Sequence, residues 1–346
     1  MFKNINFEIL KNNKYEKEIL SWRNDPITRQ NSINQQVISV NNHKEWIKSQ
    51  LENMETKLIM HFVDNMPAGL VKLDKLNKNE FGISINLNPD FRGKKLSSRF
   101  INNSLHHLLE NQGEKEIEVL ASIKPNNVPS INAFERSGFT LRNRDYQDNL
   151  YLFSKKLIKV EKILFLGYSE EESNLIDHLK DLNFEVDNLS NKIKPDLFEN
   201  YDLVISYGYR YILSKQQLEK CLQEPINLHT SYLPWNRGAH PNFWAFYDNT
   251  PHGVSIHLID EGIDTGKILL QKLVKFNKGI SFYDSYKQLR KEMEKLFINN
   301  SLDLVYNTVK PFETKLEGSF HVTSQLPKDI NWKMNIKEYL ESNENE

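Results

Sequence analysis

The chain has little cysteine and no long hydrophobic segment. Of its 346 residues only Cys221 is a cysteine, which excludes a disulfide framework within the chain. No apolar run approaches the roughly 20 residues that a membrane-spanning helix needs. The N-terminal segment 1–18 also lacks the apolar stretch of a signal peptide. These absences predict a cytoplasmic protein with no membrane partner.

The chain also lacks an excess of charge of either sign. Its 45 Lys and Arg residues are balanced by 46 Asp and Glu residues, which gives a formal net charge of −1. Proteins that bind nucleic acids present a basic surface to the phosphate backbone, so this balance predicts no nucleic-acid partner. Hydrophobic residues make up 39% of the chain and charged residues 26%, as in ordinary globular proteins, and the length is enough for two domains.

The first domain is expected at residues 1–158 and has a mixed α+β pattern with an antiparallel start. Segments with helical periodicity alternate with strand-like segments. The expected helices cover 15–23, 43–52, 96–110 and 128–137, and the expected strands cover 58–64, 68–73, 81–87, 116–122 and 151–158.

The second domain is expected at residues 159–346 and has a βαβ rhythm. The apolar run 161–167 ends in glycine, as the buried first strand of a parallel sheet does. Further strands are expected at 184–189, 202–207, 226–230 and 254–259, with helices at 170–182 and 214–222. This order predicts a doubly wound α/β sheet of the Rossmann type. A later amphipathic helix over 281–299 either packs within the monomer or serves a homodimer, since symmetric dimers are common.

Three polar residues stand where the strands of the second domain end. Asn227 and His229 are two positions apart on a strand, so both point to one face, and Asp264 lies in a glycine-flanked loop after another strand. Ligands of open parallel sheets bind where strand ends meet such loops. An amide and an imidazole can stabilise an oxyanion, and a carboxylate can orient the imidazole and help to remove a proton from an attacking amine. The pattern therefore suits acyl transfer.

These residues also carry a family resemblance. Asn-x-His at 227–229, a Leu-Pro and Arg-Gly loop at 233–238, and Asp-x-Gly-x-Asp-Thr-Gly at 260–266 resemble the formyltransferases that use 10-formyltetrahydrofolate. The resemblance covers roughly residues 160–335. It implies that Asn227 holds the formyl oxygen, that His229 stabilises the oxyanion and takes part in proton transfer, and that Asp264 positions His229.

The resemblance further implies a pterin site formed by the backbone of 207–212 and 259–264. The residues expected to bind the donor are Tyr207, Gly208, Tyr209, Ile212 and Asp260, with packing as the alternative role of the tyrosines. His240 and His257 lack the cysteine or carboxylate partners that would complete a zinc site, so no metal is expected.

The expected acceptor of the formyl group follows mainly from features that the sequence lacks. The segment 166–172 after the first strand has one glycine and three acidic residues, which suits a phosphate poorly and argues against the purine-pathway branch of the family. A basic C-terminal domain of the kind that the initiator-tRNA branch adds is not expected, because little sequence follows Trp332. The segment 318–332 resembles the tail of the branch that formylates amino groups on nucleotide-linked deoxysugars. A nucleotide-linked amino sugar is therefore the expected partner, with Arg237 as its diphosphate contact or as part of the loop structure.

Two segments of the first domain resemble the acetyl-CoA-dependent N-acetyltransferases of the GNAT fold. One is 91–101, which precedes a helix, and the other is 127–139, which follows the next strand. The resemblance covers about residues 4–158 and implies that backbone N–H groups near Arg92–Ser98 hold the pyrophosphate of CoA. The residues expected to bind CoA are Arg92, Gly93, Lys94, Ser97, Asn127 and Asn132.

The sequence also departs from this second family. Lys95 stands where the loop usually has glycine, and Phe134 stands where a tyrosine often protonates the CoA thiolate, which a phenylalanine cannot do. Three roles therefore remain open: an active acetyltransferase, a degenerate domain that binds substrate or supports a dimer, and an acetyltransferase for proteins. The early Trp22-Arg23-Asn24 resembles members that acetylate sugar-nucleotide amines, but it also occurs in protein-modifying members.

Overall fold

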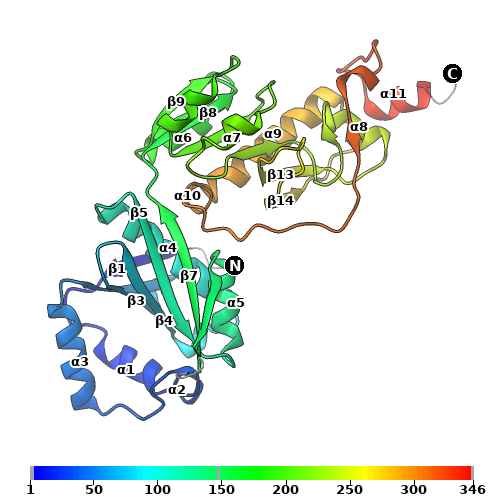
Figure 1. Cartoon of the computed structure of the whole chain (residues 1–346). Helices are drawn as coiled ribbons and strands as arrows, with labels where there is room; N and C mark the ends of the chain where they lie inside the picture. The colour runs from blue at the N-terminus through cyan, green and yellow to red at the C-terminus, as the bar shows by residue number, and fades with distance from the viewer. Residues whose placement is uncertain (1–3, 146–148, 344–346) are drawn as a thin grey trace. The chain divides into compact units, whose positions relative to one another are not determined.

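The computed structural model describes residues 4–145 and 149–343 of the chain, which divides into two compact units (Figure 1). Unit 1 contains the residues up to Lys159 together with the short segment Tyr306–Lys310. Unit 2 contains Val160–Val305 and the residues from Pro311 onward. No helix within the described ranges is long and apolar enough to cross a bilayer.

Unit 1 is built on a mixed sheet in the order β1-β2-β3-β4-β5-β7-β6. All neighbouring strands are antiparallel except β4 and β5, which run parallel. The strands are β1 (Ile5–Ile9), β2 (Thr56–Val63), β3 (Met66–Lys75), β4 (Glu80–Leu87), β5 (Glu116–Ile123), β6 (Thr140–Asp145) and β7 (Leu150–Ile158). The expected mixed α+β fold is confirmed, with β1 and β6 as additional strands.

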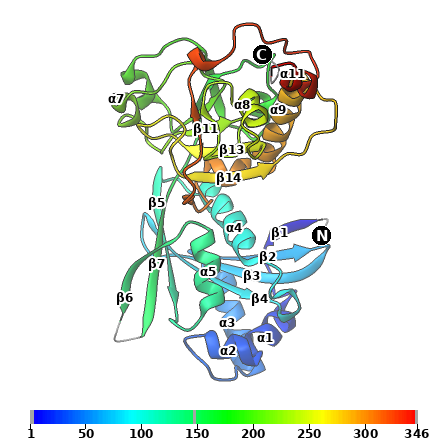
Figure 2. The ribbon, with the colours of Figure 1, turned by 90° about the vertical axis from the view of Figure 1, so that its right-hand side faces the viewer.

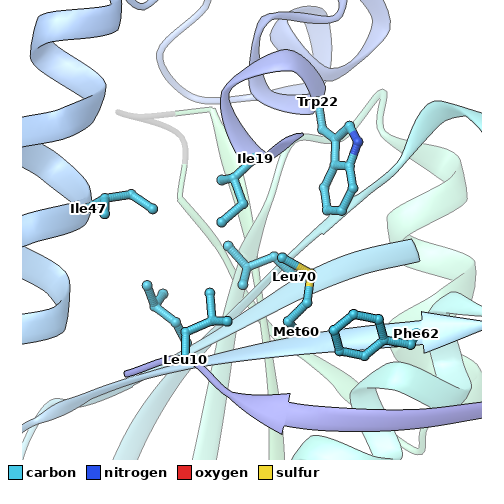
Figure 3. Packing of buried hydrophobic residues seen from close by; sticks show 8 residues of the cluster. Leu10, Ile19, Trp22, Ile47, Met60, Phe62 and Leu70 are labelled. Atoms are coloured by element: carbon cyan, nitrogen blue, oxygen red, sulfur yellow. The ribbon is translucent and has the colours of Figure 1, made fainter. Parts of the chain in front are cut away.

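Helices cover both faces of this sheet because alternate strand residues point to opposite sides. They are α1 (Glu16–Asn24), α2 (Pro26–Asn31), α3 (Val40–Glu52), α4 (Ser97–Asn111) and α5 (Val128–Arg136). On one face Ile19 and Trp22 of α1 and Ile47 of α3 pack against Met60 and Leu70 (Figure 3). On the other face the ring of His61 stacks on Phe100 of α4 at 4.5 Å, and Figure 2 shows α4 and α5 over this side.

Unit 2 is built on a mostly parallel sheet in the order β14-β13-β11-β10-β8-β9. Its strands are β8 (Lys162–Gly167), β9 (Glu185–Leu189), β10 (Leu203–Tyr207), β11 (Ile226–His229), β13 (Gly253–Leu258) and β14 (Ile268–Leu273). The first four strands along the chain pair in parallel, as the βαβ rhythm predicts. β13 and β14 are antiparallel to their neighbours, which the periodicity of the sequence does not indicate.

Six helices complete unit 2 within the described residues. They are α6 (Leu175–Asp181), α7 (Lys215–Leu218), α8 (Pro241–Tyr247), α9 (Phe282–Ile298), α10 (Ser301–Val305) and α11 (Ile336–Asn343). α9 begins after Ser281, whose hydroxyl accepts a hydrogen bond from Asp284 N at 3.0 Å. Its apolar residues Phe282, Leu289 and Met293 are at most 2% exposed, so the apolar face of α9 packs into the core of unit 2. A homodimer stays a prediction.

The segment Tyr306–Lys310 packs with unit 1, although it follows α10 in the chain. Asn102 donates to the carbonyl of Thr308 at 3.2 Å, and His106 Nε2 lies 3.1 Å from the Thr308 hydroxyl. Lys155 Nζ donates to the carbonyl of Asn307 at 2.6 Å. Buried polar groups of α4 and β7 thus find partners on a segment far away in sequence.

Candidate active site

The site of unit 2 begins at the end of β11, where Asn227 and His229 share a face. The antiparallel pairing of β11 with β13 sets Asn227 opposite His257. Their side chains meet, because Asn227 Nδ2 lies 3.1 Å from His257 Nε2. His257 therefore belongs to the same cluster as Asn227, although the sequence predicts only that His257 lies on a strand.

Asp264 lies between the two histidines. Its carboxylate lies 3.6 Å from His229 Nδ1 and 3.4 Å from His257 Nε2. It also accepts hydrogen bonds from Asn227 Nδ2 at 3.2 Å and from the backbone N–H of Gly238 at 2.9 Å. The backbone of Asp264 is left-handed, with φ +51°, a conformation that side-chain-bearing residues adopt only where the surroundings fix it. The structure thus brings Asn227, His229 and Asp264 together.

The hydrogen bonds restrict the protons on the two rings. His257 Nδ1 lies 2.8 Å from the carbonyl of Leu258, so Nδ1 carries the proton and Nε2 can accept from Asn227. His229 Nε2 lies 3.2 Å from the carbonyl of Asn236, while Nδ1 faces Asp264. The Asn236 carbonyl is within hydrogen-bond distance of Nε2, whereas the Asp264 carboxylate lies beyond that distance and acts on Nδ1 as a nearby negative charge.

The electrostatics of Asp264 follow from the same contacts. Burial by itself would raise the pKa of this carboxyl, but the histidine charges, the His257 contact and the Gly238 N–H outweigh it. The net result is a pKa well below the usual range of aspartate. Asp264 is thus a fixed negative charge and a weak base at neutral pH.

The loop that carries Asp264 is shaped by its glycines and by Asp260. The Asp260 carboxylate accepts from Gly262 N at 3.0 Å and from the Thr265 hydroxyl at 2.6 Å. A Cβ on Gly266 would lie 1.8 Å from the carbonyl of Leu258, so only glycine fits there. The Asp-x-Gly-x-Asp-Thr-Gly pattern is therefore also the pattern that folds this loop.

A cavity of about 870 Å³ opens over these residues. Its lining includes eight of the residues expected from sequence, namely Tyr207, Gly208, Tyr209, Ile212, Asn227, His229, Asp260 and Asp264. Arg237 is not among the lining residues, although its neighbour Gly238 is, and Arg237 Nε is buried without a hydrogen-bond partner. The exposed Arg210, which lies within the segment 207–212 expected to form the pterin site, also lines the cavity, although no role is expected for its side chain from the sequence.

One wall of the cavity is a group of tyrosines. The hydroxyls of Tyr168 and Tyr286 lie 2.5 Å apart, and the Arg290 guanidinium lies 4.1 Å from the centre of the Tyr168 ring. Gly208 has φ +73°, and a Cβ there would lie 2.5 Å from the Tyr168 ring. Tyr207 is 1% exposed, and burial, only partly offset by Arg290, raises the pKa of its hydroxyl. The Tyr207 side chain is thus packed in the core, and its expected backbone contact with the donor stays a prediction. Tyr168 directly follows β8, in the segment whose sequence suits a phosphate poorly.

The late segment of the chain forms another wall. β12 (Arg237–Gly238) pairs in parallel with β15 (Phe320–His321), and Arg237 N donates to the carbonyl of Ser319 at 2.9 Å. Phe320, His321, Val322 and Thr323 line the cavity. The segment 320–323 therefore forms part of the site.

The loop before α4 in unit 1 carries the expected CoA residues Arg92, Gly93, Lys94 and Ser97. Gly93 and Lys95 are left-handed, with φ +73° and +57°, and α4 begins at Ser97. Arg92 Nη2 donates to the Asp25 carboxylate and to the Thr28 hydroxyl, both at 2.6 Å. The Arg92 side chain is thus bound within the protein, and Lys94 Nζ lies 4.7 Å from the centre of the Phe91 ring.

The second expected CoA segment is α5. Asn127 caps this helix, accepting from Ser130 N at 3.3 Å, and Asn132 is exposed. Phe134 is 2% exposed and packs edge-on against Phe139. Phe134 is therefore a core residue.

Comparison with known protein families matches each unit separately. Residues 162–300 match the formyl transferase family, and residues 11–140 match the acetyltransferase (GNAT) domain family. The chain joins a GNAT acetyltransferase domain to a formyl transferase domain. The two family resemblances expected from the sequence are confirmed.

The relatives of the formyl transferase domain include enzymes with different acceptors. The formyltransferase PseJ from Anoxybacillus kamchatkensis, solved with UDP-4,6-dideoxy-4-formamido-L-AltNAc and tetrahydrofolate, is 35% identical. The match covers 51% of this chain and 96% of PseJ, with a TM-score of 0.47. The methionyl-tRNA formyltransferase of Thermodesulfovibrio yellowstonii is 45% identical over 92 residues, which is 26% of this chain and 29% of that protein. The chain spans less than half the length of such curated relatives.

The acetyltransferase domain has more distant relatives among solved structures. Spermidine N-acetyltransferase from Vibrio cholerae, solved with CoA and spermine, is 13% identical, with a TM-score of 0.41. That match covers 45% of this chain and 95% of the other. Across the described part of both domains, no group of three or more His, Cys, Asp or Glu side chains is placed to hold a metal ion.

Proposed function

We propose that the formyl transferase domain moves a formyl group from 10-formyltetrahydrofolate to the amine of a nucleotide-linked amino-deoxysugar. The observation that carries the proposal is the cluster of Asn227, His229, His257 and Asp264 at the base of a cavity of about 870 Å³. Such volumes accommodate a cofactor-sized ligand. The acetyltransferase domain is proposed to be an acetyl-CoA-dependent N-acetyltransferase acting on the same class of acceptor.

The donor would enter beside the segment Tyr207–Ile212. Gly208 and the loop 260–264 offer backbone groups to a flat ring, and Arg210 is an exposed cation on the same cavity. The glutamyl tail of a folate carries carboxylates, which a guanidinium binds well. We propose Arg210 as the contact of that tail.

The proposed chemistry follows from the hydrogen bonds of the site. The acceptor amine attacks the formyl carbon, the carbonyl oxygen becomes an oxyanion, and the bond from that carbon to folate N10 then breaks. Both hydrogens of the Asn227 amide are engaged, by His257 and Asp264, so one must turn to the formyl oxygen when the donor binds. His229, oriented by the Asp264 carboxylate 3.6 Å from its Nδ1, is proposed to stabilise the oxyanion by donating an N–H hydrogen bond.

Proton transfer completes the reaction. The amine loses a proton as its nitrogen bonds to the formyl carbon, and N10 of the folate gains one as it leaves. His229 is the group suited to move this proton, because Asp264 is too weak a base to retain it. Asp264 is thus proposed as the charge that positions His229 and not as the general base.

The acceptor class rests on different support. PseJ is 35% identical over 96% of its length and was solved with a UDP-linked 4-formamido sugar. The tail segment Phe320–Thr323 lines the cavity, and the chain has a net charge of −1, which does not suit a tRNA. The match to methionyl-tRNA formyltransferases leaves aminoacyl-tRNA as the competing acceptor.

A direct comparison of acceptors tests the proposal. The full chain is incubated with 10-formyltetrahydrofolate and either UDP- or dTDP-linked 4-amino-4,6-dideoxysugars or methionyl-tRNA, and products are weighed by mass spectrometry. The proposal expects a sugar nucleotide heavier by one formyl group. Formylation of the tRNA with no amino sugar modified would overturn it.

A further inference from the structure

The ring of His229 is held from outside the cavity by the backbone of Asn236. Asn236 is buried and does not line the cavity. Its carbonyl oxygen lies 3.2 Å from His229 Nε2. Because a carbonyl oxygen can only accept a hydrogen bond, this contact requires that Nε2 carries the proton. The neutral ring then has its unprotonated nitrogen, Nδ1, on the side of the Asp264 carboxylate.

The hydroxyl group of Ser319 in turn fixes Asn236. Ser319 Oγ accepts from Asn236 N at 2.8 Å and donates to Asn236 Oδ1 at 3.0 Å, while Asn236 Nδ2 donates to the Thr250 hydroxyl at 2.7 Å. The backbone of Asn236 is left-handed, with φ +56°, a conformation that asparagine adopts more readily than most residues but still at a cost. The orientation of its carbonyl therefore depends on the bonds that hold this conformation, and two of them come from one hydroxyl.

Ser319 belongs to a segment that is fastened to the same loop by its backbone. Ser319 N donates to the carbonyl of Pro234 at 3.2 Å. Gly318 has φ +71°, and a Cβ there would clash with the same carbonyl, so only glycine lets the segment approach this closely. The residues that follow, 320–323, line the cavity, whereas Ser319 itself does not. One segment thus forms a wall of the cavity and holds the loop that contacts His229.

We propose that Ser319 is a positioning residue of formyl transfer, which acts through Asn236 to keep the proton of His229 on Nε2 and so leaves Nδ1 to accept the proton of the attacking amine. The inference rests on the proposed formyl transfer and adds residues that touch neither substrate. A proton taken up at Nδ1 lies beside the Asp264 carboxylate, which favours the uptake, and passes from there to folate N10 as the donor bond breaks. Without the hydroxyl the Asn236 N–H loses its acceptor and the carbonyl can turn away. The ring then populates the other tautomer, in which Nδ1 already carries a proton and cannot accept one.

Nitrogen NMR of the full chain labelled with 15N-histidine tests the inference without any substrate. The His229 signals are those that disappear in His229→Gln. The unmodified chain and Ser319→Thr, which keeps the hydroxyl, are expected to show neutral His229 protonated at Nε2, and Ser319→Ala is expected to show a mixture with the Nδ1-protonated form. In the formyl-transfer assay Ser319→Ala should lower kcat about tenfold with unchanged KM for donor and acceptor, and Ser319→Thr should restore the rate. The matched control Ser324→Ala removes an exposed hydroxyl of the same segment and should change neither the spectrum nor the rate.

The outcomes separate this inference from the proposed function. A tautomer that depends on the Ser319 hydroxyl, in a chain that formylates no amino sugar, would support the positioning of His229 and refute the proposed acceptor. Formylation of an amino sugar with Ser319→Ala raising only the acceptor KM would overturn the inference and leave the function, because the segment would then serve binding alone. Should Ser319→Ala fold poorly, the unmodified chain decides: a neutral His229 with its proton on Nε2 supports the inference, and one with its proton on Nδ1 overturns it.

Discussion

Replacing Asp264 with asparagine should disable formyl transfer while leaving the fold intact. The amide keeps an acceptor for the Gly238 N–H, which is 2.9 Å away, but it loses the negative charge that lies 3.6 Å from His229 Nδ1. At an effective dielectric constant of about 20, Coulomb's law gives about 4–5 kcal/mol for unit charges at that separation. Desolvation offsets part of this, so a net loss of about 2–3 kcal/mol in transition-state stabilisation is expected, which is about 30- to 150-fold in kcat/KM.

The assay is the steady-state rate of formyl transfer to an amino-sugar nucleotide with 10-formyltetrahydrofolate. Glu261→Gln is the matched control, because Glu261 belongs to the same loop, changes in the same way and pairs only at the surface with Lys215. The control should retain its rate. A folded Asp264→Asn protein with an unchanged kcat/KM would refute the charge argument.

Three further predictions concern the same site. His257→Ala removes the acceptor of Asn227 and should lower kcat about tenfold or more with a smaller effect on the donor KM, measured by the same assay; an effect on KM alone would contradict its role in holding Asn227. Gly208→Ala adds a Cβ 2.5 Å from the Tyr168 ring at a residue with φ +73°, so it should lower the free energy of unfolding by about 1–3 kcal/mol and weaken folate binding. Gly113→Ala is the control, because a Cβ there meets open space, and it should change neither quantity. Calorimetry measures both the unfolding and the binding. The depressed pKa of Asp264 means that its contribution to stability is fully present above the unfolded value of about 4 and is lost as the pH falls through the lower folded value. Acid unfolding should therefore begin at higher pH in Asp264→Asn than in the unmodified protein. Acid-unfolding curves that coincide for the two proteins would contradict this prediction.

Much of the fold could be predicted because its signals are local. The apolar runs of β8 and β10 and the periodicity of α9 identify buried elements without knowledge of their neighbours. The motif residues Asn227, His229 and Asp264 come together because the loops that carry them have their own glycine and aspartate signatures. The sequence motifs that fold these loops therefore also contain the residues of the site.

What the sequence did not indicate depends on long-range pairing. His257 faces Asn227 only because β13 runs antiparallel to β11, and strand direction leaves no mark on apolar periodicity. The contact between Thr308 and His106 likewise depends on the path of the chain after α10, where a short segment packs with unit 1. Arg210 lies in a segment whose backbone is expected to bind the donor, but only the cavity that it lines makes its side chain a candidate for binding.

The central claim is that this cluster transfers a formyl group from folate to a sugar amine, and following the label from 10-[13C]formyltetrahydrofolate by NMR tests it most directly. The account predicts a 13C formamide signal on a nucleotide-linked amino sugar with the unmodified chain and its loss in His229→Ala. A label that stays on the folate with every amino sugar, or that moves equally well without His229, would contradict it.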